Sequence, residues 1–103
     1  MYSIIIDDSV FEDLETIYNF CKSHHGISYA SKTIKIIFNS IYSLKKFPNF
    51  NPIYSTNNAT IIRKKVVNKR YIIIFRTIYD SVYIYNIFDG RQNIKFSNYS
   101  NLN

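Results

Sequence analysis

The sequence has no tryptophan, one cysteine, two glycines and two prolines among its 103 residues. A single cysteine excludes an internal disulfide framework and any zinc site built on several cysteines. The scarcity of glycine and proline excludes collagen-like chains and proline-rich linkers. No apolar run approaches the roughly 20 residues that a membrane-spanning helix needs. The first residues, Met1 to Asp8, lack the basic start of a signal peptide, so we expect a soluble cytoplasmic protein.

Apolar residues make up 47% of the chain and aromatic residues 17%, which argues against intrinsic disorder. We expect one domain over residues 1–103, because a chain of this length can bury one modest core. Its last part, 93–103, is rich in Asn and Ser and is expected to be a flexible tail. Isoleucine, asparagine, lysine, tyrosine and phenylalanine form more than half of the chain, and their codons predict a bacterium or mobile element with an AT-rich genome.

Charge is divided unevenly along the sequence. Residues 1–27 carry five acids and one base, a net charge of −4, whereas residues 28–103 carry twelve bases and two acids, a net charge of +10. The bases are densest between Arg63 and Arg76, and Arg91 and Lys95 follow. Such a patch attracts polyanions or an acidic protein partner, and a solvated face of a lysine-rich protein is the alternative of equal weight.

The first part of the sequence predicts a strand and then a helix. The apolar run from Tyr2 to Ile6 favours a strand. A capping box, Ser9-x-x-Glu12, predicts the start of an amphipathic helix. Gly26 suits the left-handed position that ends such a helix.

A second amphipathic helix is predicted to follow, with Ser28 as its N-cap. It must end by Phe47, because Pro48 disfavours helical geometry in the residue before it. The apolar stripes of the two helices can pack together as an antiparallel hairpin. The segment 47–58, with both prolines and four asparagines, is expected to be a loop.

The rest of the chain predicts strands over 60–67, 71–78 and 82–88, joined by short connectors as an antiparallel meander. The run Tyr71–Phe75 is apolar on both faces, so it is expected to be the central strand, covered by the helices. The predicted fold class is therefore α+β, with a strand, a two-helix antiparallel hairpin and a three-stranded meander whose sheet packs on the helices.

Few residues match a catalytic arrangement. His24 and His25 are adjacent at a helix end, where cationic side chains suit the helix dipole, so a shared metal is not expected. Cys21 lies on the apolar stripe and is interpreted as a buried hydrophobe, with a Cys21–His24 nucleophile pair as the less favoured alternative. The five acids between positions 7 and 15 are interpreted as helix-start residues rather than an acid–base pair. We expect no metal and no organic cofactor.

The basic residues of the strands are the remaining candidates. Arg63 and Lys65 are two residues apart, so they share one face of a strand, and Lys64 lies on the other. Arg91 follows the last strand, and we expect Arg63, Lys65 and Arg91 to meet on one accessible surface. Cations beside tyrosines could bind a nucleic acid or receive an acidic protein segment.

The order of these features resembles the RelE/ParE toxins of bacterial type II toxin–antitoxin modules. The resemblance covers about residues 2–93. It rests on the basic strand from Ile62, the aromatic and aliphatic strand from Tyr71 to Arg76, the strand from Val82 to Phe88 and the closing Asp89-Gly90-Arg91. Asp13-Leu14 in the first helix, Ala30 in the second and Leu44-x-x-Phe47-Pro48 at its end also match.

The resemblance implies a growth-inhibiting toxin that a cognate acidic antitoxin neutralises, of the kind found in plasmid stabilisation modules. One branch, ParE-like, binds DNA gyrase, and the other, RelE-like, cleaves mRNA on the ribosome with basic residues and often a C-terminal Tyr. Arg63, Lys65 and Arg91 match the basic positions, with Tyr99 as a further candidate if the chain is a nuclease. Ile72 stands where nucleases often carry Arg, and Ser97 stands in register with their Tyr. A ParE-like toxin is therefore favoured, and a RelE-like endoribonuclease is the alternative.

Overall fold

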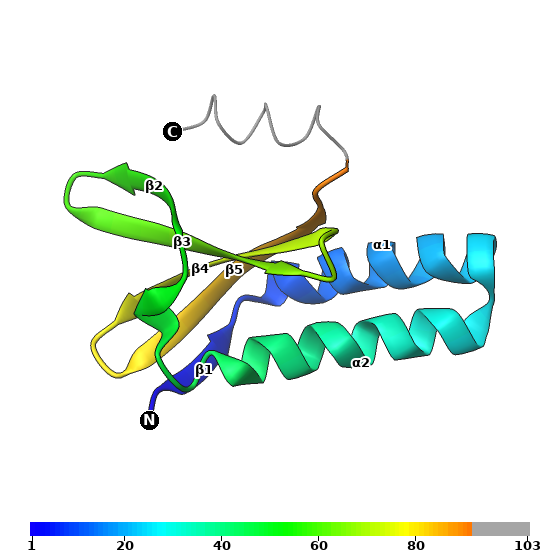
Figure 1. The fold of residues 1–103 in the computed structure, drawn as a ribbon, viewed down its shortest axis with the longest axis horizontal. Coiled ribbons are helices and arrows are strands. Elements are labelled where there is room, and N and C mark those ends of the chain that lie inside the picture. The colour runs from blue at the N-terminus through cyan, green and yellow to red at the C-terminus, as the bar shows by residue number, and fades with distance from the viewer. Residues whose placement is uncertain (92–103) are drawn as a thin grey trace.

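The computed structural model describes residues 1–91, which form a five-stranded sheet with two helices against one of its faces (Figure 1). The strand order across the sheet is β1-β5-β4-β3-β2. The predicted α+β class, the helical hairpin and the antiparallel meander are confirmed. Along the chain the elements are β1 (Ser3–Ile6), α1 (Asp8–His25), α2 (Ile27–Ser43), a 3-10 turn η1 (Pro48–Phe50), β2 (Ile53–Asn57), β3 (Thr60–Val67), β4 (Tyr71–Ile78) and β5 (Ser81–Asp89).

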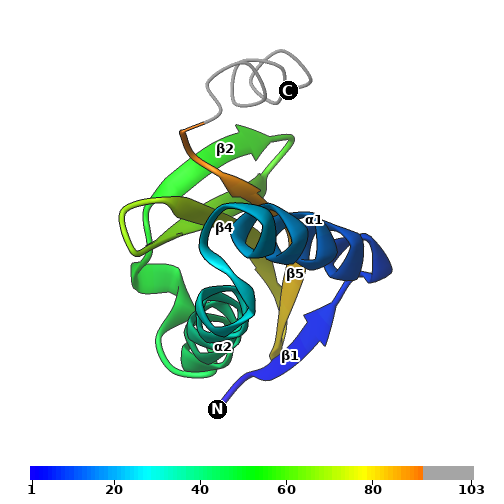
Figure 2. The ribbon, with the colours of Figure 1, turned by 90° about the vertical axis from the view of Figure 1, so that its right-hand side faces the viewer.

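The two helices lie side by side as an antiparallel pair (Figure 2). Each buries one apolar stripe against the sheet, as the helical spacing predicts. A single residue, Gly26, connects them, and its φ of 93° is a conformation that residues with a Cβ rarely adopt. The buried residues of the stripes are Val10, Leu14, Ile17 and Cys21 in α1, and Ala30, Thr33, Ile37 and Ile41 in α2.

Both predicted helix caps are wrong. α1 begins at Asp8, two residues earlier than a Ser9 N-cap predicts, and no side chain caps it. The Ser9 hydroxyl donates instead to the carboxylate of Asp7, so it does not cap the first turn. α2 begins at Ile27, before Ser28, because Gly26 ends the first helix and starts the second within one residue.

The central strand is β4, as its two apolar faces predict, and all of its residues from Tyr71 to Phe75 are buried. β1 pairs in parallel with β5, which makes the sheet mixed. The expected loop over 47–58 is wrong in part, because it contains η1 and the strand β2. β2 pairs with β3 across a tight turn in which Asn58 and Ala59 both have positive φ values, 48° and 70°, as two-residue hairpins require.

The pairing of β3 with β4 covers only part of each strand. It runs from Val67 opposite Tyr71 to Arg63 opposite Phe75 and then stops. Beyond that point β3 continues only with β2, and β4 continues only with β5. The two β-hairpins therefore diverge like the arms of a fork, visible as the two green and yellow loops of Figure 1.

Candidate binding face of the sheet

The sheet has two unlike faces. The helix-covered face holds the main core, to which β3, β4 and β5 contribute Val67, Phe75 and Ile84 among others. The opposite face has a smaller apolar cluster of Ile72, Ile74 and Phe88, on which Tyr54, Ile62 and Tyr85 pack. All six residues of this cluster come from strands, so within residues 1–91 no helix covers it. We call this surface the open face.

Two cations lie on the open face. Lys64 is directly opposite Ile74, and Arg76 is directly opposite Tyr83, and residues opposite one another in an antiparallel pair share a face. The rings of Tyr83 and Tyr85 are 4.9 Å apart beside Arg76. The Nε atom of Arg76 is buried and has no hydrogen-bond partner among the described residues. The open face thus combines an apolar cluster, two phenol rings tilted against one another, and a guanidinium with an unused donor.

The Tyr85 phenol on the open face is not suited to act as a base. Burial raises the pKa of Tyr85; the nearby Arg76 cation opposes the shift, and Tyr83 and Asp7 add to it. The phenol therefore stays protonated near neutral pH and acts as a hydrogen-bond donor rather than a base. Asp7 lies at the rim, where its carboxylate accepts hydrogen bonds from Ser9 and, at 3.4 Å, from the Tyr83 hydroxyl.

Two of the predicted site residues lie on the covered side of the sheet instead. Arg63 and Lys65 share a face, as their spacing predicts, but it is the face of Val67, which the core buries. The Arg63 Nη1 atom donates to the Asn51 carbonyl at 2.8 Å, and the Lys65 Nζ atom donates to the Ser43 hydroxyl at 3.0 Å. Both cations therefore bind the loop and helix end beside β3.

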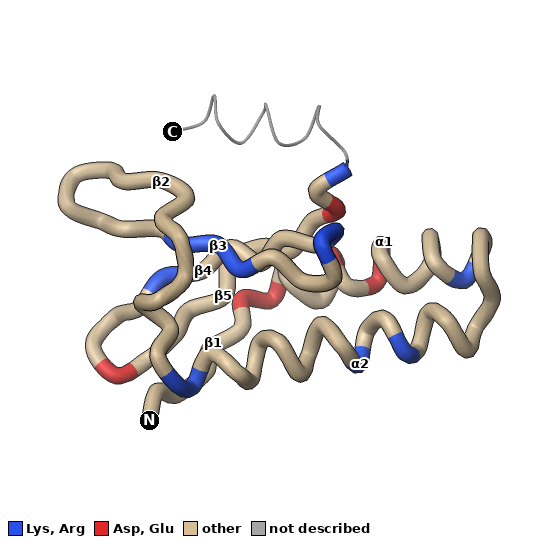
Figure 3. Tube along the Cα trace, viewed as in Figure 1, with Lys and Arg blue, Asp and Glu red and all other residues tan. Residues whose placement is uncertain are grey.

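Arg91 lies at another end of the sheet. Lys65 is level with Ile73 and Ile87 across the strands, and Arg91 comes four residues after Ile87, beyond the end of β5 at Asp89. The Arg91 side chain pairs with Asp89, with Nε 3.4 Å from Oδ1. The expectation that Arg63, Lys65 and Arg91 meet on one surface is therefore wrong. Figure 3 shows basic positions spread over β3, α2 and the end of β5.

Asp89 joins the turn after β3 to the end of β5. It accepts hydrogen bonds from the Arg91 backbone N–H and from Arg70 Nε, each at 3.0 Å. Burial alone would raise the pKa of Asp89, but the hydrogen bonds from Arg91 and Arg70 outweigh it and lower the pKa. Arg70 also covers the rings of Phe20 and Tyr71. The Asp89 carboxylate therefore has a structural role, and Arg91 is already engaged with it through its side chain and its backbone N–H.

The other candidates have structural partners. Cys21 is fully buried, as expected, with its Sγ atom 3.5 Å from the Tyr71 hydroxyl. His24 is exposed; its Nδ1 atom donates to the Phe20 carbonyl at 2.9 Å and its ring stacks on Phe20. Residues 1–91 hold no group of three or more His, Cys, Asp or Glu side chains that could bind a metal ion. The predicted tail 93–103, with Ser97 and Tyr99, lies outside the described residues.

One polar residue has a role that the sequence pattern did not indicate. Asp13 was interpreted as a helix-start residue, but its Oδ2 atom accepts hydrogen bonds from the Ile87 backbone N–H and from Asn86 Nδ2, each at 2.9 Å. The pairing of β1 with β5 ends at Ile84, so the next part of β5 lacks a strand partner there. Asp13 supplies an acceptor to that unpaired edge from α1.

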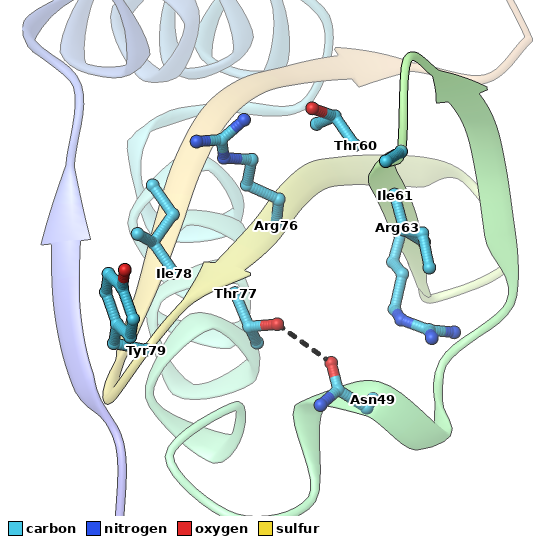
Figure 4. Close-up of a pocket in the computed structure, with 9 residues that line it drawn as sticks. Asn49, Thr60, Ile61, Arg63, Arg76, Thr77, Ile78 and Tyr79 are labelled. Carbon is cyan, nitrogen blue, oxygen red and sulfur yellow. Dashed lines mark hydrogen bonds between the residues drawn. The ribbon is translucent and has the colours of Figure 1, made fainter.

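The fork between the two hairpins forms a cleft of about 490 Å³. Figure 4 shows its lining residues coming from both arms, with Arg76 and Thr60 pointing to one side of the sheet and Arg63 and Thr77 to the other. Thr77 donates a hydrogen bond to the Asn49 side chain at 3.1 Å, which ties the β4 arm to η1.

Among the described residues, neither helix is long and apolar enough to cross a membrane. No protein-family model matches the sequence. No curated protein matches it either. Among solved structures, the chain is similar to one described as the chromosomal ParDE TA system from P. aeruginosa, with a TM-score of 0.75 and 20% sequence identity. The match covers 86% of this chain and 96% of that chain. The fold expected from the RelE/ParE resemblance is therefore confirmed.

Proposed function

We propose that this chain is the toxin of a type II toxin–antitoxin module, a cytoplasmic, ParE-like growth inhibitor that binds DNA gyrase and that a cognate acidic antitoxin neutralises. The observation that carries the proposal is the shared fold with a chain of a ParDE system over 96% of that chain. The order of strand, helical hairpin and meander that first suggested the RelE/ParE family agrees with this match.

The side chains of the sheet support binding rather than RNA cleavage. Cleavage of RNA needs a group that removes the 2′-hydroxyl proton and groups that stabilise the developing charge. Arg91 lies at another end of the sheet from Arg63 and Lys65, and all three side chains are already engaged with protein atoms. Tyr85 on the open face stays protonated. A surface of this kind is suited to recognition of a partner protein.

Controlled expression of the chain in bacteria tests the proposal. We expect growth arrest without loss of mRNA, and purified protein that blocks the supercoiling activity of gyrase. A double variant, Lys64→Gln with Arg76→Gln, removes two charges from the open face. Its matched control, Lys32→Gln with Lys35→Gln, removes two positive charges from the exposed surface of α2. Normal growth on expression of the folded wild-type chain would refute the toxin assignment.

A ribosome-dependent endoribonuclease is the second candidate. The observation in its favour is the pair of cations, Lys64 and Arg76, beside the Tyr83 and Tyr85 rings, because single-stranded RNA binds to cations and stacks on aromatic rings. Primer extension on mRNA from arrested cells separates the two candidates. Cuts within translated codons that disappear in the Lys64→Gln, Arg76→Gln double variant and persist in the Lys32→Gln, Lys35→Gln control would establish the nuclease and exclude the gyrase mechanism.

A further inference from the structure

The fork leaves two strand edges without a partner. In the described structure Thr60–Ile62 of β3 pairs with β2 alone, and Arg76–Ile78 of β4 pairs with β5 alone. An antiparallel strand directs backbone N–H and C=O groups to both of its sides. The sides of these two segments that line the cleft therefore present backbone groups that no strand of residues 1–91 takes up.

Local backbone features hold the fork open. A bulge in the pairing of β4 with β5 lies between Ile74 and Phe75, where β3 leaves β4. A second irregularity lies in β2 between Ile53 and Ser55. Bulges bend a strand and increase its twist, so the two hairpins leave the common sheet in different directions. The cleft is thus formed by the strands themselves and exists before any ligand arrives.

The cleft has room for a segment of chain and offers two kinds of contact. Its volume of about 490 Å³ falls in the range of roughly 300–1,000 Å³ typical of ligand sites. Ile61 and Ile78 provide apolar surface, and Thr60 and Thr77 provide hydroxyl groups. Tyr79, at the turn that closes the β4 arm, exposes 96% of its surface although it adopts a φ of 50°. The two-residue turn between β4 and β5 accounts for the positive φ, and the exposed ring of Tyr79 is part of the lining of the cleft.

The charge of the cleft is positive. Arg63 and Arg76 both line it, and no acidic residue does. Arg63 donates to the Asn51 carbonyl, whereas the buried Nε atom of Arg76 has no partner among the described residues. A buried donor without an acceptor is unfavourable until a ligand supplies one. A carboxylate beside Arg76 would satisfy that donor and balance the charge.

We propose that this cleft binds an extended acidic segment of a partner protein, which enters between β3 and β4 as an added strand. The proposal rests on the proposed function, because it assigns the segment to the antitoxin. Arg76 and Thr77 point to opposite sides of the sheet, so a segment in which acidic and β-branched residues alternate fits best. Its acidic side chains lie on the Arg76 side, and its apolar side chains lie on the side of Ile61.

The test uses a fluorescein-labelled octapeptide of alternating Glu and Val and the purified full chain. We expect saturable binding by anisotropy, with NMR shifts concentrated at the backbone amides of Thr60–Ile62 and Arg76–Ile78. Arg76→Gln is expected to weaken binding about tenfold, as loss of a charged hydrogen bond does. Lys69→Gln removes the same charge from the exposed turn between β3 and β4 and is expected to leave the affinity unchanged.

Two further peptides decide whether a strand is added. We expect no binding of an octapeptide of alternating Lys and Val, because its charge is positive like that of the cleft. We also expect no binding of a Glu–Val peptide that is N-methylated at alternate residues, because it cannot form hydrogen bonds with a strand edge. The proposal would be overturned if either of these peptides bound as tightly as the unmodified Glu–Val peptide. It would also be overturned if the unmodified Glu–Val peptide did not bind, or if its amide shifts were confined to other surfaces. Arg76→Lys, which keeps the charge, shows whether weakening by Arg76→Gln reflects misfolding.

The two proposals fail separately. If the chain arrests growth but the Glu–Val peptide does not bind at the fork, the strand-addition proposal is refuted and the toxin assignment stands. If the peptide binds at the fork but expression leaves growth normal, the cleft remains a binding site for acidic segments and the toxin assignment is refuted.

Discussion

Replacing Asp89 with asparagine should destabilise the end of the sheet where β4 begins and β5 ends. The Asp89 side chain is only 11% exposed and that of its partner Arg70 is 13% exposed. Asparagine keeps the shape of the side chain and one acceptor for the Arg91 N–H. It removes the negative charge, however, and leaves the Arg70 guanidinium with a neutral partner. Arg70 already has one buried nitrogen, Nη2, without a partner among the described residues.

The size of the effect follows from these contacts. A hydrogen bond to a charged group contributes about 1.5–3 kcal/mol, and removal of one member of a fully buried ion pair costs about 3–5 kcal/mol. Asp89→Asn keeps part of the interaction, so we expect a loss of about 2 kcal/mol in the free energy of unfolding. For a chain of about 100 residues this lowers the melting temperature by about 10 °C.

The effect should depend on pH in a defined direction. The folded state lowers the pKa of Asp89 below its ordinary value, so the carboxylate stabilises the fold above about pH 3.9, its unfolded value. This contribution is lost as the pH falls through the folded pKa. The difference in stability between wild type and Asp89→Asn should be full at pH 7 and should shrink steadily below about pH 4.

Thermal and urea unfolding of the two proteins at several pH values measure this difference. The matched control is Asp80→Asn, which removes the same charge from the exposed turn between β4 and β5. We expect the control to change stability by less than about 0.5 kcal/mol. Equal melting temperatures for the two variants, or an Asp89→Asn deficit of the same size at pH 3 and pH 7, would refute the account of this ion pair.

Three other substitutions test the packing. Asp13→Ala leaves the Ile87 N–H without its acceptor and should reduce stability by about 1–3 kcal/mol in urea unfolding, with faster hydrogen exchange at that amide. Gly90→Ala would place a Cβ atom 2.9 Å from the Arg70 carbonyl oxygen, so we expect a melting temperature lower by several degrees. Phe75→Ala empties a fully buried position of β4 and should destabilise by about 3–5 kcal/mol in urea unfolding. An unchanged midpoint in any of these experiments would contradict the contact described for that residue.

The sequence pattern was sufficient to predict those elements whose structure depends on residues close together in the chain. The predicted bounds of β3 and β4 coincide with the observed ones, Thr60–Val67 and Tyr71–Ile78, because short turns separate two clear runs of β-forming residues. The helix stripes were equally clear. β2 was missed because Pro52 and three nearby asparagines obscure a short strand whose partner is fixed only when β3 is in place.

The site was harder to predict, since it depends on which face of the sheet the helices cover. A spacing of two put Arg63 and Lys65 on one face, but only the burial of Val67 shows that this face is the covered one. Lys64 and Arg76 were assigned no role, although they lie on the open face with the tyrosines. The position of Arg91 depends on the register of three strands, and no pattern in the sequence fixes that register.

The pairing of β1 with β5 has a consequence for how the protein is made. Ser3, near the start of the chain, lies beside Ser81, and the buried Ile84 of β5 is opposite Ile6. On the ribosome the helices and the β2–β3 hairpin emerge first, and contacts between such distant residues form late. The nascent chain therefore cannot assemble its mixed sheet until the last strand has left the exit tunnel. Until β5 has emerged, any surface that depends on the complete sheet is absent, and a partner that recognises that surface cannot bind the nascent chain.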